Sequence, residues 1–211
     1  MKKLFALIFS FLLQGPLFAQ TLKTLPRQTQ KWPVVISVLK QNISLPFDRM
    51  VAITGTRPLN PGFSVGTQYT YRQGRKTQLY QTGQTGLFLN KNNGNGIFLG
   101  TDVGYKITLA KTGLYTEYQI GLNYLHCFLP GNSYKLNNLG EYEPAKNGGN
   151  GSALVTASIS LGFEKENRFI KVSPFIKYQP AVQFFYNPGL PVIPQSYLHV
   201  GVKINSHFNN Q

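Results

Sequence analysis

The chain has 211 residues, of which 21 are Lys or Arg and 7 are Asp or Glu, giving a formal net charge of +14. Charged residues make up 13% of the chain, against roughly 25% in soluble domains, whereas glycine, Tyr and Phe are abundant. Such a composition excludes a disordered chain and a coiled coil, and the single cysteine excludes a disulfide scaffold. It is typical of a chain built from many short strands.

The N-terminus has the pattern of a secretory signal peptide. Two lysines precede the apolar run Leu4–Leu13, and Gly15 and Pro16 end that run. We therefore expect residues 1–19 to be a signal peptide and residues 20–33 to be a mobile, basic start of the mature chain. Beyond this start, no apolar run reaches the about 18 residues that a transmembrane helix requires.

From residue 62 onward, apolar residues recur at every second position, which is the period of a strand. In the first such segment, for example, Phe63 and Val65 lie on the face opposite Ser64. Six segments alternate clearly, and a seventh, 76–90, has the composition of a strand but an ambiguous phase. In chain order the segments are 62–72, 76–90, 97–109, 114–124, 153–163, 170–179 and 198–204.

An even number of strands requires one more strand upstream, because bacterial membrane barrels have even strand counts. Residues 34–54 supply it, either as Val34–Phe47 or as Asn42–Thr54, and the sequence does not decide between the two. A short amphipathic N-terminal helix over Trp32–Gln41 is a further alternative. We therefore expect an all-β fold, a single antiparallel up-and-down transmembrane β-barrel of eight strands over residues 34–208.

Short and long connections alternate along the chain, as they do in transmembrane barrels with short periplasmic turns and longer external loops. With both termini in the periplasm, the short set faces the periplasm and the long set faces outside. The short set is 73–75, 110–113 and 164–168, and the long set is 91–95, 128–150 and 186–194.

The apolar face of the strands distinguishes a membrane barrel from a soluble one. A soluble lipocalin-like barrel turns its apolar face inward and its charges outward, whereas a membrane barrel does the reverse. Here the apolar face extends over about ten residues per strand, which suffices to cross a bilayer at about 45°. The opposite face carries Gly, Ser, Thr and Gln instead of many Lys and Glu. The sequence therefore favours a monomer in the cell outer membrane, in contact with lipid and lipopolysaccharide.

Three stretches carry a resemblance to a known family, namely Asn42–Phe47, Asn60–Tyr69 and Leu198–Ile204. Through them the chain resembles the small outer-membrane β-barrel proteins of Gram-negative bacteria, over nearly all of its mature length. The resemblance implies a barrel in the outer membrane. It supplies no catalytic residues.

The polar faces of the strands place charged side chains inside the barrel. An interior of eight strands is just wide enough for side chains, so a packed, hydrogen-bonded interior is expected, with a narrow anion-preferring pore as an alternative. Buried charges persist only when they are paired or hydrated. The predicted lumen residues are five bases and two acids: Arg72, Lys106, Lys171, Lys177, Lys203, Asp102 and Glu117.

His126 is the strongest candidate for chemistry, because it lies at a strand end beside Cys127 and near a loop that contains Glu141 and Glu143. A His with a Ser and an acid at the barrel rim would suggest an acyl hydrolase acting on lipid A or phospholipid. Lipid A deacylases place a Ser two residues after the His, where this chain has Phe128. Since that nucleophile is missing, we expect no enzyme activity, and the hydrolase is kept as an alternative.

The expected function is a structural or surface-recognition role, as an adhesin or an envelope stabiliser, through the external loops. The predicted contact residues in these loops are Tyr134, Tyr142 and Tyr186. No Cys/His cluster has the spacing of a metal site, and we expect no cofactor. The basic residues are scattered along the chain, which argues against nucleic acid as a partner.

Overall fold

The computed structural model describes residues 32–43, 59–109, 113–128, 130, 133–137, 140–145, 148–166, 170–187 and 190–206. The predicted signal peptide, 1–19, and all but the last two residues of the segment 20–33 lie outside these ranges. Within them, no helix is long and apolar enough to cross a membrane.

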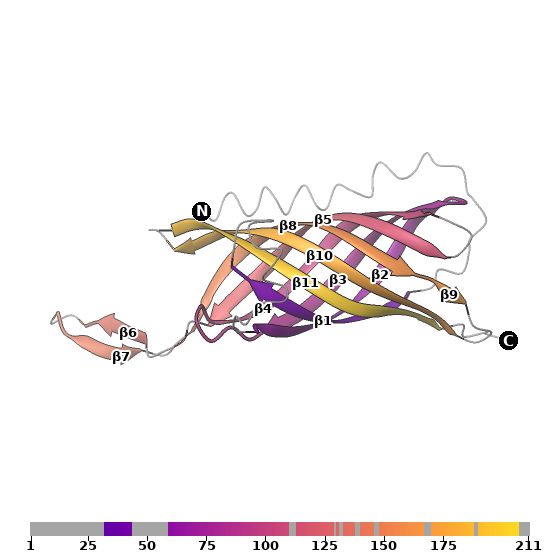
Figure 1. The fold of residues 1–211 in the computed structure, drawn as a ribbon. Helices are drawn as coiled ribbons and strands as arrows, with labels where there is room; N and C mark the ends of the chain where they lie inside the picture. The colour runs from indigo at the N-terminus through magenta and orange to yellow at the C-terminus, as the bar shows by residue number, and fades with distance from the viewer. Residues whose placement is uncertain are drawn as a thin grey trace. The chain divides into compact units, whose positions relative to one another are not determined.

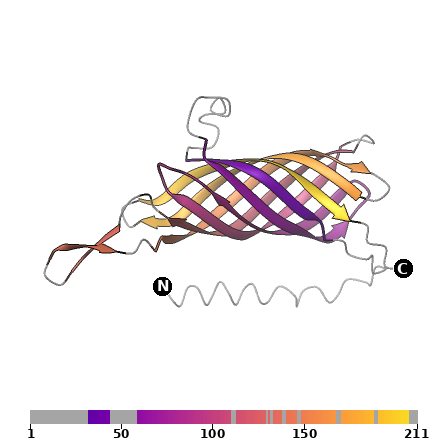
Figure 2. The same ribbon diagram turned by 90° about the horizontal axis from the view of Figure 1, so that it is seen from below.

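Eight long antiparallel strands form a closed barrel (Figure 1). They are β1 (Val34–Asn42), β2 (Pro61–Gln73), β3 (Thr77–Phe88), β4 (Asn95–Thr108), β5 (Leu114–Phe128), β8 (Asn150–Phe163), β10 (Ile170–Asn187) and β11 (Leu190–Ser206). Each pairs with the next along the chain, and β11 also pairs with β1, from Val34↔Ile204 to Asn42↔Ser196. Figure 2 shows this closure, with the indigo first strand beside the yellow last one. The predicted up-and-down barrel is confirmed.

The first strand begins at Val34, as one of the two alternatives had it, and ends at Asn42, earlier than predicted. The alternative prediction of a helix over Trp32–Gln41 is wrong, because most of this segment is a strand. Three β-branched residues at the start of this segment favour an extended chain, and β2 and β11 supply hydrogen-bonding partners on both sides of β1.

The connection between β5 and β8 contains a separate hairpin, where the sequence predicted only a long loop. Its strands are β6 (Ser133–Leu136) and β7 (Tyr142–Ala145), which pair from Ser133↔Ala145 to Leu136↔Tyr142. A two-residue strand, β9 (Lys165–Glu166), pairs only with the start of β10.

The predicted long loop 186–194 is wrong. β10 continues to Asn187 and β11 starts at Leu190, so only two residues separate the strands. The prolines that suggested a loop are tolerated, since an extended strand fits their fixed φ and each removes only one ladder hydrogen bond. At Pro180 the pairing with β8 is interrupted, while the pairing with β11 continues.

The connections sort onto the two ends of the barrel. We call the end where β1 starts and β11 finishes the terminal end; it carries the β2–β3, β4–β5 and β8–β10 connections. The opposite end, the loop end, carries the other connections, including the β6–β7 hairpin. This sorting is the one predicted, and the assignment of the terminal end to the periplasm stays a prediction.

Glycines make room for large side chains inside the barrel. A Cβ added at Gly104 would overlap the Tyr80 ring, and one added at Gly162 would overlap the Tyr115 ring. Both tyrosines are fully buried. Because small residues on one strand accept rings from its neighbour, an eight-stranded barrel can be filled without a wide channel.

Candidate functional site

The outside of the barrel is apolar and the inside is polar. Along β5, for example, Ile120 and Leu122 are exposed while Gln119 and Asn123 are buried. This is the reverse of a soluble barrel and the arrangement of a transmembrane one. Antiparallel barrels with an even number of strands and this orientation of faces are the outer-membrane type. The chain is an outer-membrane β-barrel.

A buried ion pair joins two opposite walls near the terminal end. Lys203 on β11 donates to Glu117 on β5, with Nζ 2.5 Å from Oε1. Ser160 on β8 donates to the other oxygen of the same carboxylate at 3.1 Å. Closer to the rim, Lys106 pairs with Glu164 and lies over the Tyr115 ring, 4.2 Å from its centroid.

Asp102 on β4 is the second buried acid, and side chains from β3 and β8 hold it. Gln84 donates to Asp102 Oδ2 at 2.8 Å, and Thr156 donates to Oδ1 at 3.2 Å. Lys177 on β10 is buried in the same layer and interacts electrostatically with Asp102. The buried side chains that the structure describes therefore include three lysines and two carboxylates, while Glu164 is half-buried beside Lys106.

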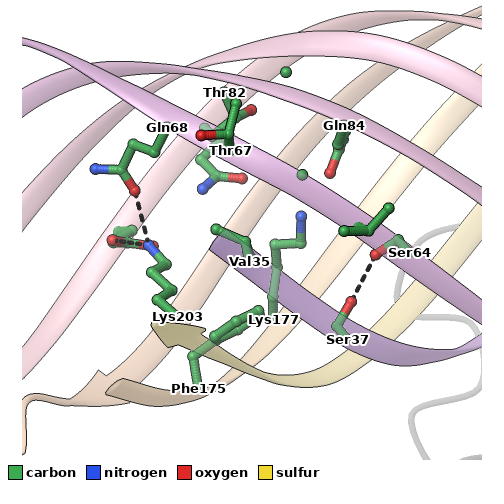
Figure 3. A pocket seen from close by; sticks show the side chains of 15 residues that line it. Val35, Ser37, Ser64, Thr67, Gln68, Thr82, Gln84, Phe175, Lys177 and Lys203 are labelled. Carbon is green, nitrogen blue, oxygen red and sulfur yellow. Dashed lines mark hydrogen bonds and ion pairs between the residues drawn. The ribbon is translucent and has the colours of Figure 1, made fainter. Parts of the chain in front are cut away.

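A small cavity, of about 30 Å³, lies beside Glu117, Lys177 and Lys203. Figure 3 shows Lys177 and Lys203 pointing into it from neighbouring strands, with Gln84 on the opposite side. A space of this size holds about two water molecules. It is far below the volume of a pocket for a small-molecule ligand, which is roughly 300–1,000 Å³.

An apolar cluster lies inside the barrel at the loop end. We call it the loop-end plug; it comprises Leu39, Phe88, Phe98, Leu125, Cys127, Leu154, Ala181 and Tyr197. Glutamine side chains line the interior beside it: Gln41 donates to Gln195, Gln195 to Gln183, and Gln183 to the Ser152 hydroxyl. The loop-end plug was not predicted, although Leu154 lies on the face of segment 153–163 that the alternation assigns to the interior.

Five of the predicted lumen residues lie inside the barrel, buried as the alternation placed them: Asp102, Lys106, Glu117, Lys177 and Lys203. Arg72 does not join them and is exposed, because the β2–β3 register shifts between Thr70 and Arg72. The side chain of Lys171 lies outside the described residues. The predicted set therefore changes in two places: Arg72 is outside, and Glu164, which was not predicted, adds a half-buried carboxylate beside Lys106.

His126 is engaged at both ring nitrogens. Nδ1 lies 3.0 Å from the Tyr124 hydroxyl and Nε2 lies 2.9 Å from the Gly148 carbonyl. A carbonyl only accepts, so Nε2 carries a proton and donates to it. To act as a general base His126 would have to break one of these bonds. Cys127 is buried in the loop-end plug.

The three predicted contact tyrosines belong to strands at the loop end. Tyr142 starts β7 and is 76% exposed. Tyr134 lies on β6 opposite Pro144, and Tyr186 lies near the end of β10; their side chains are outside the described residues. Among the described residues, no group of three His, Cys, Asp or Glu side chains could hold a metal ion.

No family model and no curated protein matches the chain. Solved structures with a similar fold include Neisserial surface protein A, at 9% identity over 84% of this chain and 97% of that one, with a TM-score of 0.49. Another is the attachment invasion locus protein Ail of Yersinia pestis, in complex with the heparin analogue sucrose octasulfate (10% identity, 84% and 99% coverage, TM-score 0.43). The N-terminal β-barrel domain of Pseudomonas aeruginosa OprF is a third (11%, 83% and 99%, TM-score 0.39). Likeness at this level says nothing about what this chain binds.

Proposed function

We propose that the protein is a closed, non-conducting barrel whose role is surface recognition, carried by the β6–β7 hairpin at the loop end. The main support is a contrast between two parts of the chain. The barrel interior is filled by charge pairs, hydrogen bonds and the loop-end plug, whereas the β5–β8 connection carries a folded hairpin of its own. Binding residues concentrate on such connections, because a rigid scaffold positions them.

The described residues of the hairpin make local contacts around Asn137. The Asn137 side chain accepts from the Glu141 backbone N–H at 2.9 Å and donates to Glu143 Oε1 at 3.1 Å. Tyr142 is exposed beside them and offers both an apolar ring and a hydroxyl to a partner. An exposed aromatic side chain on a paired strand loses little conformational entropy on binding, because its backbone is already fixed.

The two alternatives have less support. A narrow anion-preferring pore needs a continuous polar path and unpaired positive charge. Apolar side chains instead cluster inside the loop end, and Lys106 and Lys203 are each paired with a carboxylate. A rim hydrolase needs a nucleophile beside His126. The nitrogens of that ring contact Tyr124 and the Gly148 carbonyl instead.

The test compares cells that display the wild-type protein with cells that display a variant whose residues 131–147 are replaced by a short Gly-Ser turn. Adhesion is measured on a panel of immobilised extracellular-matrix proteins and polysaccharides. The matched control replaces the Lys91–Asn93 turn at the same end. We expect the wild type and the control to adhere to at least one surface and the hairpin variant to lose that adhesion. Equal adhesion by cells with and without the protein would contradict the proposal.

A further inference from the structure

A β-bulge turns Arg72 away from the barrel interior. The β2–β3 pairing is regular from Gly62 to Thr70 and resumes at Arg72, so Tyr71 is the extra residue. Because a bulge inserts one residue, the side chains beyond it no longer follow the alternation of the rest of the strand. Tyr71 and Arg72 are consequently both exposed.

Three exposed cations therefore lie close together in sequence at the terminal end. Arg75 and Lys76 occupy the turn between β2 and β3, and Arg72 comes just before it. Among the described residues none of the three forms an ion pair. The hairpin Pro61–Phe88 contains no Asp or Glu that could neutralise them.

Aromatic side chains next to these cations mark the membrane boundary. Trp32 is 60% exposed and packs edge-on against Tyr69, with ring centroids 5.6 Å apart. Tyr69 in turn packs against Tyr71, at 5.1 Å. Amphipathic rings at the ends of barrel strands lie at the level of the lipid headgroups. Arg72 follows Tyr71 directly in the chain, so the cations lie at the height of the lipid phosphates.

We propose that this turn binds the phosphodiester headgroups of anionic glycerophospholipids through Arg72, Arg75 and Lys76. The planar guanidinium donates two parallel hydrogen bonds to phosphate oxygens, which suits it to this ligand. Long basic side chains also reach the headgroup layer while their methylene stems stay against apolar surface. The inference rests on the proposed orientation, in which the terminal end faces the phospholipid leaflet on the periplasmic side.

The chain's single tryptophan makes the site directly observable. The full mature protein is reconstituted in vesicles of phosphatidylethanolamine that contain a minor fraction of phosphatidylglycerol. Bromine on the acyl chains of either lipid quenches Trp32 fluorescence on contact. We expect brominated phosphatidylglycerol to quench more strongly than brominated phosphatidylethanolamine at equal mole fraction, and this preference to weaken as salt is added.

The decisive variant is Arg72→Gln/Arg75→Gln/Lys76→Gln, whose changes are all at exposed positions. Each cation near an anionic surface strengthens association about fivefold, so the preference for phosphatidylglycerol should disappear in this variant. Lys91→Gln, an exposed turn lysine at the loop end, should keep the preference in full. Arg72→Lys/Arg75→Lys should keep most of it, because the charge remains.

Equal quenching of the wild type by the two brominated lipids would overturn the inference. Displacement of brominated phosphatidylglycerol by added lipopolysaccharide, but not by unlabelled phosphatidylglycerol, would also overturn it, since the ligand would then belong to the other leaflet. Two variants distinguish this lipid binding from the proposed recognition role. The variant without residues 131–147 should keep its lipid preference, and the triple Gln variant should keep its adhesion.

Discussion

Lys203 and Glu117 meet inside the barrel, with Nζ 2.5 Å from Oε1, although their strands, β11 and β5, are not neighbours in the sheet. The Glu117 side chain is 1% exposed and that of Lys203 is 11% exposed. Lys203 also donates to Gln68 on β2, at 3.4 Å. The pair thus connects distant walls of the barrel, and removal of one partner leaves the other charge buried.

Glu117→Gln should therefore destabilise the barrel by about 3–5 kcal/mol, the cost of an uncompensated buried charge. The measurement is urea unfolding in phospholipid vesicles, followed by Trp32 fluorescence. The control is the double variant Glu117→Leu/Lys203→Met, which removes both charges and should unfold much closer to the wild type. A double variant less stable than the single one would contradict this account of the pair.

Two glycines should respond in opposite ways to the same substitution. A Cβ at Gly121 would overlap Asp102 Oδ1, whereas a Cβ at Gly83 meets nothing within 4 Å. Gly121→Ala should destabilise by about 1–3 kcal/mol, because overpacking displaces a buried carboxylate and its hydrogen bonds. Gly83→Ala should be neutral or slightly stabilising. Equal unfolding midpoints for the two variants would show that the interior beside Asp102 has room for the added methyl group.

Ile120 is 70% exposed near the middle of β5 and should face lipid. Ile120→Arg should cost about 2–4 kcal/mol in vesicles, as a charge does at the bilayer midplane. Ile120→Leu serves as the control and should fold like the wild type. An Arg variant that folds as well as the Leu variant would contradict the assignment of this face to the membrane.

His126 should hold the end of the β5–β8 connection against the barrel wall through the Gly148 carbonyl. His126→Phe keeps an aromatic ring beside Phe128, 4.8 Å away in the wild type, but removes both hydrogen bonds. We expect faster proteolysis within residues 129–149 and an unchanged unfolding midpoint of the barrel. Unchanged proteolysis would show that the contact does not restrain the connection.

The sequence was sufficient for most strands because inward and outward residues differ in polarity. β3 was ambiguous in phase for a physical reason: its outward positions include Gln81, Gly83 and Thr85 instead of apolar residues. Gln81 donates to Thr101, and Thr85 donates to the Phe98 carbonyl. These hydrogen bonds satisfy the polar groups on the outward face. The alternation of polar and apolar residues does not reveal such bonds.

Other features of the barrel depend on how the strands pair, and the periodicity of the sequence does not specify the pairing register. The bulge at Tyr71 moved Arg72 outside because one extra residue reverses the alternation beyond it. Glu164 was not assigned to the interior because it follows the last alternating residue of its strand. Its pairing with Lys106 joins the end of β8 to β4, with β5 between them, and so depends on how the strands are arranged in space. The composition of Tyr186–Pro194 suggested a loop because prolines are rare in strands.

Trypsin added to intact cells tests whether the β6–β7 hairpin lies outside the cell. Residues 129–149 contain Lys135 and Lys146, while the terminal-end turn contains Arg75 and Lys76. Fragments are assigned by mass spectrometry, with permeabilised cells as the control that both ends can be cut. We expect cleavage after Lys135 or Lys146 and an intact β2–β3 turn. Cleavage after Arg75 or Lys76 with residues 129–149 protected would contradict it.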